Sequence, residues 1–321
     1  MKTRHISELF LNELKTGYFS PIVDIVKVDP SLDIELRGTD VMIYYRGGKI
    51  LTVNEPKDVI KCVADAEKLL KPLDSSYYKG DSIIKPSIDV IDEYFAKAKH
   101  FIDLYEIKKS KLGEKEIQQR VVAENNYSVN SDQSDFFIAD MEWEENSSLE
   151  GRADIVAFYW GHMDHKKKNL TMYLIEVKQG HKAIKTDKPN TKEESPGLLK
   201  HFHDFDSFRN DPKTVEFTKK DMLEVLCQKT ELGLVIGLDK LFLEDKNGHL
   251  STKGIIIEDK VEFVYLLANY LHFSEQLKHE LNLLPDECNF FCSCFLGYGL
   301  YKRFIINKKN IAHYPDIFVA K

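Results

Sequence analysis

The sequence has few cysteines, and their arrangement predicts neither disulfides nor a metal cluster. There are five, an odd number, and three of them crowd together at Cys288, Cys292 and Cys294. This pattern is not that of a secretory disulfide framework. No second cluster with zinc-ligand spacing follows, and Phe290 and Phe291 stand among the three, so buried structural thiols are favoured over a zinc site.

Long apolar runs are also missing. No stretch approaches the roughly 20 apolar residues that a membrane-spanning helix needs. The opening segment, MKTRHISELFLNELK, is amphipathic and has no continuous apolar region of the kind that signal peptides carry. We therefore expect no membrane association and a cytoplasmic location.

An excess of positive charge is the third feature that the sequence lacks. The formal net charge is −7, with 45 basic and 52 acidic residues. Proteins that coat nucleic acid through bulk electrostatics are usually basic, so this class is disfavoured. A site rich in carboxylates is still compatible with the balance, because its acids add to the negative total and local lysines set the local field.

The first hundred residues form an α+β pattern. The runs LDIELRG and VMIYYRGGKILTV are rich in β-branched and aromatic residues and are broken at Gly38, Gly47 and Gly48, which predicts a small antiparallel meander. A polar segment ending near Gly113 reads as a linker. We predict an N-terminal α+β domain at 1–110 and a second domain at 111–321. The helices expected in the first domain cover residues 5–16, 57–70 and 86–107.

The second domain begins with alternating element types. The expected order is a helix (EKEIQQRVVAENN), three strands (DFFIADMEWEE, GRADIVAFYW and LTMYLIEVKQG), a helix capped by Ser195, a further helix to about Thr230 and a strand (LGLVIGL). An apolar helix around VEFVYLLANYL, an amphipathic stretch around SEQLKHELNLL and a strand at CNFFCSCF follow. These patterns predict an α/β fold with an αβββαβ core, a mixed sheet flanked by helices, and a C-terminal helical extension.

Charged residues interrupt two strands that should be interior. The tripeptide Glu-x-Lys is common in a chain that is 30% charged, but Glu176 and Lys178 directly follow the run Tyr-Leu-Ile. Asp154 interrupts the apolar strand ADIVAFY in the same way. Charged groups are rarely placed on buried strands unless they are paired or bind a metal.

The spacing predicts that these acids meet. Residue 165, in the polar loop between the two strands, lies midway between Asp154 and Glu176, so a symmetric hairpin places the two acids directly opposite one another. A register slip of one residue would turn one of them to the other face. Hard oxygen ligands at this spacing suit Mg²⁺ or Mn²⁺, and Lys178 would orient water or bind phosphate. The alternative is a structural salt bridge of Asp154 or Glu176 with Lys178, with Arg152 as a further partner.

GRADIVAFYW followed by LIEVKQG resembles the second and third strands of the PD-(D/E)xK nuclease superfamily. The similarity covers about residues 114–240, includes FFIADMEW before and SPGLLKHFHDF after, and extends to uncharacterised bacterial members. The proline of the PD motif is absent here, since Ala153 precedes Asp154. The resemblance implies a restriction-endonuclease-like core, phosphodiester hydrolysis, and metal ligation by Asp154, Glu176 and the backbone carbonyl of Val177.

The helix EKEIQQRV resembles the superfamily's preceding helix, which often offers a glutamate to the metal. The resemblance implies Glu116 as that residue, Glu114 as the second choice, and Gln119 one turn further on. The alternative for this helix is a solvated charged surface.

Five other residues are candidate accessories to the site. Asp140 and Glu142 alternate on their strand and face either the site or, as the favoured alternative, the wet side of an edge strand. His201 shares a helical face with Asp204 and Phe208, and a histidine satisfied by helix packing is the favoured alternative to phosphate or water contact. Lys182 and Lys185 are candidate contacts to a nucleic-acid backbone.

The site pattern and the resemblance together imply a magnesium-dependent DNA endonuclease of restriction, repair or phage defence. DNA is favoured over RNA as substrate, and the N-terminal domain would supply specificity, a partner-protein contact or a homodimer interface. A nuclease-like scaffold without catalysis is the second hypothesis. A different hydrolase that uses carboxylates and His201 is the third, but no nucleophile elbow, P-loop or His-Glu-x-x-His helix supports it.

Overall fold

The structure is a computed structural model of the chain. It describes residues 2–55, 78–79, 82–83, 91–107, 113–127, 134–144, 152–161, 168–187, 197–238, 240–268, 274–293 and 297–311. Among these residues, no helix is both long and apolar enough to cross a membrane.

The chain folds into two compact units. The N-terminal unit comprises Lys2–Asp132 and Asp221–Lys253, and the sheet unit comprises Gln133–Lys220 and Gly254–Lys321. This division differs from the single boundary that the sequence predicted near residue 110. The linker-like composition there marks a change of element, but it carries no signal that a distant segment, 221–253, joins the first unit.

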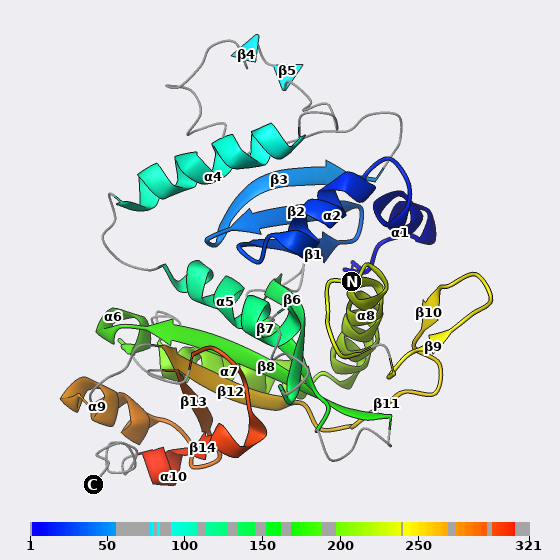
Figure 1. The fold of residues 1–321 in the computed structure, drawn as a ribbon. Coiled ribbons are helices and arrows are strands. Elements are labelled where there is room, and N and C mark those ends of the chain that lie inside the picture. The colour runs from blue at the N-terminus through cyan, green and yellow to red at the C-terminus, as the bar shows by residue number, and fades with distance from the viewer. Residues whose placement is uncertain are drawn as a thin grey trace, which may run out of the picture. The chain divides into compact units, whose positions relative to one another are not determined.

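The N-terminal unit contains the antiparallel meander that the sequence predicted (Figure 1). Strand β1 (Leu32–Arg37) pairs with β2 (Asp40–Tyr45), and β2 pairs with β3 (Gly48–Asn54). Gly47 in the second turn has a φ of 74°, and a Cβ added there would lie 2.5 Å from the Lys115 backbone carbon. Glycine is therefore required at this turn both for its backbone conformation and for space.

Helices pack around this meander. Helix α1 (Glu8–Lys15) lies within the helix predicted at residues 5–16, and the Ser7 hydroxyl accepts a hydrogen bond from the Phe10 amide at its N-cap. Helix α2 (Ser20–Val28) was not predicted, because its β-branched sequence SPIVDIVKV reads equally well as a strand. The remaining elements of the unit include α4 (Ile91–Ile107), α5 (Glu114–Val122), the π-helical turn η3 (Ala123–Tyr127) and the strands β4 (Tyr78–Lys79), β5 (Ser82–Ile83), β9 (Leu243–Glu244) and β10 (Leu250–Ser251). The helix expected at 57–70 lies outside the described residues.

A histidine in the N-terminal unit makes its stability depend on pH. The His5 Nδ1 atom lies 2.7 Å from Asp221 Oδ1, and this hydrogen bond raises the pKa of His5, with burial opposing it and the charges of Asp221 and Glu224 adding to it. A raised histidine pKa gives stability that is fully present below pH ~6.5 and is lost as the pH rises through the folded-state pKa. The His5 side chain is 38% exposed, so we expect an effect below about 1 kcal/mol. Urea unfolding between pH 5.5 and 8.5 measures it, and the His5→Gln variant should show a flatter profile.

The sheet unit is built on one mixed sheet with the order β14-β13-β12-β8-β7-β6 (Figure 1). Strands β6, β7 and β8 form an antiparallel meander, and β8, β12 and β13 then run parallel. The short strand β11 (Ile256–Ile257) pairs with the start of β8. The strands are β6 (Phe136–Glu144), β7 (Arg152–Tyr159), β8 (Asn169–Gln179), β12 (Glu262–Ala268), β13 (Asn289–Ser293) and β14 (Ile306–Asn307).

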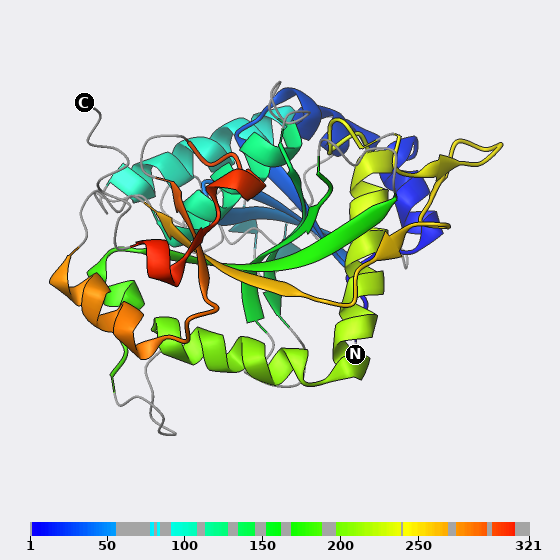
Figure 2. The same cartoon turned by 90° about the horizontal axis from the view of Figure 1, so that it is seen from below.

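Helices of the sheet unit flank the sheet, which makes the unit a mixed α/β fold. Helix α7 (Leu198–Arg209) runs along one face, with α9 (Glu275–Leu283) beside it (Figure 2). Helix α8 (Pro212–Glu231) follows, and the division between the two units falls within it. The shorter elements are α6 (His181–Ile184), the 3₁₀ turn η6 (Lys302–Phe304) and α10 (Lys308–Ile311).

Three predictions about the second domain, residues 111–321, were wrong. The run LGLVIGL forms turns instead of a strand. The segment VEFVYLLANYL was expected to be helical, but Glu262–Ala268 within it is strand β12. A parallel strand buried on both faces reads as a continuous apolar run, which periodicity cannot distinguish from a buried helix. Helix α7 has Gly197 as its N-cap, and Ser195, the predicted cap, lies outside the described residues. The C-terminal region thus contributes the strands β11, β12, β13 and β14 to the sheet as well as helices.

Candidate functional site

The β7–β8 hairpin has the register that the sequence predicted. Ile155 pairs with Ile175 and Val156 with Leu174, so Asp154 and Glu176 come next in the same register. Residues opposite one another in an antiparallel pair share a face of the sheet. The predicted register of the hairpin is therefore confirmed as far as Ile155 and Ile175, and the meeting of the two acids one residue further on stays a prediction.

Asp154 lies where the regular pairing of β7 and β8 ends. Its Oδ2 atom accepts a hydrogen bond of 2.7 Å from the backbone amide of Val177. The carboxylate thus contacts the backbone of the segment that carries Glu176 and Lys178. This places Asp154 at the Glu-x-Lys segment itself.

Glu176, Lys178 and His201 form a compact triangle. Lys178 Nζ lies 2.6 Å from Glu176 Oε1, and His201 Nε2 lies 3.1 Å from both of these atoms. Glu176 and Lys178 are almost fully buried, while the His201 side chain is 18% exposed. The salt bridge that we considered as the structural alternative is present between Glu176 and Lys178, and His201 contacts it directly.

Helix α7 is held over this face of the sheet by contacts along its length. The Tyr265 hydroxyl, on the β12 residue paired with Glu176, donates a hydrogen bond of 2.6 Å to the Leu198 carbonyl. The helix also carries Phe205, stacked on Phe263 of β12, and Phe208, in edge contact with Trp143 of β6. His201, one turn from the Tyr265 contact, is thereby fixed above Glu176 and Lys178.

The buried position of Glu176 controls its electrostatics. Burial raises the pKa of Glu176. The positive charges of Lys178 and Arg152 lower this pKa, and the negative charge of Glu142 raises it further. Contact with the Lys178 ammonium favours the ionised form of Glu176. Without a nearby cation, the buried carboxylate would be costly to ionise. A group with this property is typical of functional sites.

Strand β6 brings a further acid to the same row. The pairs Met141–Ile155 and Trp143–Ala153 flank Glu142 and place it opposite Asp154. Glu142 has a φ of 57°, a left-handed backbone conformation that is uncommon for residues other than glycine and clusters at functional sites. The sequence pattern favours the solvent-facing side of an edge strand at this position. Its alternation with Asp140 was the available signal, but the local backbone conformation was not visible in the sequence.

The other accessory acid, Asp140, is fully buried. The favoured interpretation of Asp140 as part of a wet edge is therefore wrong. It pairs with Val156, two residues from Asp154 on the same face of β7. Asp140 thus stays among the candidate residues of the site.

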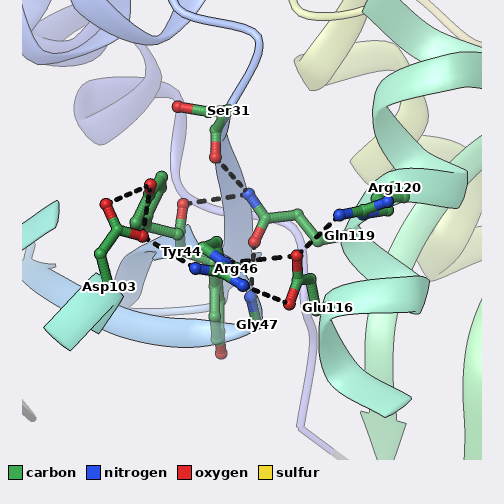
Figure 3. A network of polar contacts seen from close by, with 9 residues as sticks. Ser31, Tyr44, Arg46, Gly47, Asp103, Glu116, Gln119 and Arg120 are labelled. Carbon is green, nitrogen blue, oxygen red and sulfur yellow. Dashed lines mark hydrogen bonds and ion pairs between the residues drawn. The ribbon is translucent and has the colours of Figure 1, made fainter. Parts of the chain in front are cut away.

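Glu116 and Gln119 lie on α5 in the N-terminal unit, in a network of polar contacts (Figure 3). Both carboxylate oxygens of Glu116 accept hydrogen bonds from Arg46, at 3.2 and 3.3 Å, and Arg120 adds one of 2.9 Å. The alternative of a solvated charged surface is wrong here, because Glu116 is only 4% exposed. These contacts give Glu116 a role in its own unit, and its role as a metal ligand stays a prediction.

Gln119 clamps the turn between β2 and β3. Its Oε1 atom accepts a hydrogen bond of 2.7 Å from the Gly47 amide, and its Nε2 donates to the carbonyls of Ser31 and Tyr44 (Figure 3). The side-chain amide therefore bonds through both its ends to the meander. This accounts for a buried glutamine on a helix without reference to a ligand.

Arg46 tests how the network stabilises the N-terminal unit. Its φ of 50° is unfavourable for a residue with a side chain, and its guanidinium binds Glu116 and Asp103. We expect Arg46→Ala to lower the free energy of unfolding by roughly 1–3 kcal/mol, because it loses these bonds and keeps the backbone strain. Arg46→Gly should be more stable than Arg46→Ala by about 1 kcal/mol. Urea denaturation of both variants measures the difference. Equal stabilities of Arg46→Ala and Arg46→Gly would contradict the inference that the backbone at position 46 is strained.

The lysines proposed to contact nucleic acid lie just after β8. Lys182 and Lys185 are exposed, and Lys185 Nζ forms an ion pair of 2.7 Å with Asp187. Exposed ion pairs of this kind contribute little to stability. The two lysines follow the Glu-x-Lys strand directly, and their contact with a nucleic-acid backbone stays a prediction.

The oxygen donors of the site fit a hard divalent cation. Mg²⁺ commonly uses one or two carboxylates and completes its shell with water and substrate phosphate, which matches the pair Asp154 and Glu176. Within the described parts of the chain, no three His, Cys, Asp or Glu side chains converge as a ready-made metal cage. The cysteines whose side chains are described, Cys227 and Cys288, are free and buried.

No family model, no curated protein and no solved structure matches the chain. The functional interpretation therefore depends on the site's own residues.

Proposed function

We propose that the protein is a metal-dependent nuclease that hydrolyses phosphodiester bonds, with its site at the end of the β7–β8 hairpin. One observation carries the proposal. Asp154 bonds to the backbone between Glu176 and Lys178, and His201 contacts both of those buried side chains. Isolated buried ion pairs are poor stabilisers compared with apolar residues, so this concentration of charge favours a functional explanation.

The residues divide into complementary roles. Asp154 and Glu176 would hold Mg²⁺ or Mn²⁺, and the Val177 carbonyl would be a further oxygen ligand. The bound cation would stabilise negative charge on the phosphate and lower the pKa of a coordinated water. Lys178 orients the scissile phosphate or the attacking water through its ammonium group. Glu142 and Asp140 lie on the adjacent strand and add negative charge that favours the cation.

The chain order of the sheet supports a restriction-endonuclease-like core for this unit. Three antiparallel strands lead through α7 and α8 to a fourth strand, β12, that runs parallel to β8. This is a βββαβ order, although its last strand is β12 and not the predicted LGLVIGL, and β7 and β8, which carry the acids, are neighbours in the sheet. The N-terminal unit holds α5, so a contribution of Glu116 to catalysis remains part of the prediction from family resemblance.

We propose DNA as the substrate, cut internally, with Lys182 and Lys185 along the path of its backbone and the N-terminal unit supplying specificity, a partner contact or a dimer interface. The assay uses the purified chain with supercoiled DNA, linear duplex and single-stranded RNA, each with Mg²⁺, Mn²⁺ or EDTA. Nicking that requires the metal and is lost in Lys178→Ala supports the proposal. Metal-independent cleavage, or equal cleavage by Lys178→Ala, would contradict the assigned site.

A binding scaffold without catalysis is the second candidate. The observation that favours it is the 2.6 Å contact between Lys178 and Glu176, which neutralises the carboxylate as a structural pair would. A scaffold predicts nucleic-acid binding in a gel-shift assay with no cleavage under any metal condition. It also predicts that apolar replacement of both partners leaves this binding unchanged.

A further inference from the structure

Lys178 already occupies the carboxylate that the proposed metal would need. Its Nζ lies 2.6 Å from Glu176 Oε1, and the two side chains are 5% and 3% exposed. A lysine ammonium and a divalent cation both seek the oxygens of this one buried carboxylate. The two cations repel one another at close range, and burial weakens the solvent screening of that repulsion.

His201 provides a second acceptor for the lysine. Its Nε2 atom lies 3.1 Å from Lys178 Nζ. A neutral histidine with its proton on Nδ1 accepts a hydrogen bond at Nε2, and an ammonium group can donate three. Lys178 can therefore keep a hydrogen-bonded partner when its contact with Glu176 is lost, without a change in its backbone position.

We infer that Lys178 is a resident cation that leaves Glu176 when a divalent metal binds, and that His201 is the positioning residue that then holds it. The inference rests on the proposed function, since it concerns the same metal site. It adds a consequence that the nuclease proposal alone does not contain. The lysine needed for cleavage should weaken metal binding in the absence of substrate.

The test measures Mn²⁺ binding without substrate, by isothermal titration calorimetry and by the paramagnetic resonance signal of free Mn²⁺. We expect Lys178→Met to bind Mn²⁺ at least about 10-fold more tightly than the wild type, because it removes the competing charge. Glu176→Gln should abolish this binding, which identifies the site being measured. Circular dichroism and thermal unfolding verify that each variant is folded.

Lys260→Met is the matched control. Lys260 Nζ lies 2.7 Å from Glu262 Oε1, so it reproduces a Glu and Lys two residues apart, but its side chain is 73% exposed. Its removal should leave Mn²⁺ affinity unchanged. An equal gain in Lys260→Met and Lys178→Met would show a general charge effect and overturn the inference.

His201→Leu tests the second half of the inference. Without the alternative acceptor, Lys178 stays on Glu176, so Mn²⁺ affinity should fall several-fold below wild type. In the Lys178→Met background the same substitution should have no such effect, because the lysine to be held is gone. Additive effects of the two substitutions would exclude the handover to His201.

The outcomes separate this inference from the proposed function. Metal-dependent cleavage by the wild type, with Mn²⁺ affinity unchanged or weaker in Lys178→Met, overturns the inference alone. Failure of both wild type and Lys178→Met to bind Mn²⁺ at millimolar concentration overturns both. Tighter binding in Lys178→Met that Glu176→Gln abolishes supports the inference, whether or not the chosen nucleic acid is cut.

Discussion

Replacement of Asp154 by asparagine should reduce metal-dependent cleavage by about 10³-fold, which corresponds to ~4 kcal/mol of transition-state stabilisation. The substitution removes one negative charge from the metal ligands and keeps the shape of the side chain. The asparagine oxygen can still accept the hydrogen bond that Asp154 Oδ2 receives from the Val177 amide. We therefore expect the loss in cleavage rate without a large loss in stability.

Single-turnover cleavage kinetics with saturating enzyme measure this effect, over a range of Mg²⁺ and Mn²⁺ concentrations. If Asp154 holds the cation, the concentration of metal needed for half-maximal rate should also rise. Asp206→Asn is a suitable control, because Asp206 pairs with Arg209 on the exposed side of α7. If Asp154→Asn is folded and as active as the wild type, Asp154 is not part of the catalytic site.

The second large effect concerns stability and lies in the N-terminal unit. Lys229 Nζ lies 2.9 Å from Glu35 Oε1, and both side chains are 0% exposed. Lys229→Met keeps most of the volume but leaves Glu35 buried without this cation. Breaking a buried pair in this way typically costs about 3–5 kcal/mol of unfolding free energy. Urea denaturation followed by fluorescence or circular dichroism should show this loss.

Two further variants test the cause. Glu35→Gln combined with Lys229→Met should recover much of the stability, because neither member of the buried pair is then left as a lone charge. Lys220 lies on the same helix and pairs with Glu216, but its side chain is 74% exposed. Lys220→Met should therefore change the free energy of unfolding by less than ~0.5 kcal/mol. A similar loss in Lys220→Met and Lys229→Met would contradict the role assigned to burial.

The local parts of the fold were predictable because their signals are local. Alternation, glycine breaks and loop symmetry predicted the three-stranded meander and placed Asp154 opposite Glu176, one residue beyond the last regular pair, Ile155 and Ile175. Register follows from loop length when a hairpin is symmetric. By contrast, β12 was mistaken for a helix because a strand covered on both faces has no alternation to read.

The environment of each charged residue was not predictable in the same way. Glu116 and Glu176 both lie in segments that resemble the metal-binding segments of the nuclease superfamily. Glu116 nevertheless pairs with Arg46 and Arg120 in the N-terminal unit, whereas Glu176 contacts Lys178 and His201 in the sheet unit. The partners Arg46 and His201 lie 70 and 25 residues away along the chain from these glutamates, respectively. No local pattern encodes such a contact.

The sequence by itself determined that acids and a lysine interrupt two apolar strands and that these strands pair in a fixed register. Only the tertiary structure decided that α7 brings His201 onto Glu176 and Lys178, that Glu142 joins the row, and that 221–253 folds with the first unit. The reason is that strand pairing across a short loop depends on neighbouring residues. Helix docking and unit assembly instead depend on which buried surfaces fit one another across the whole chain.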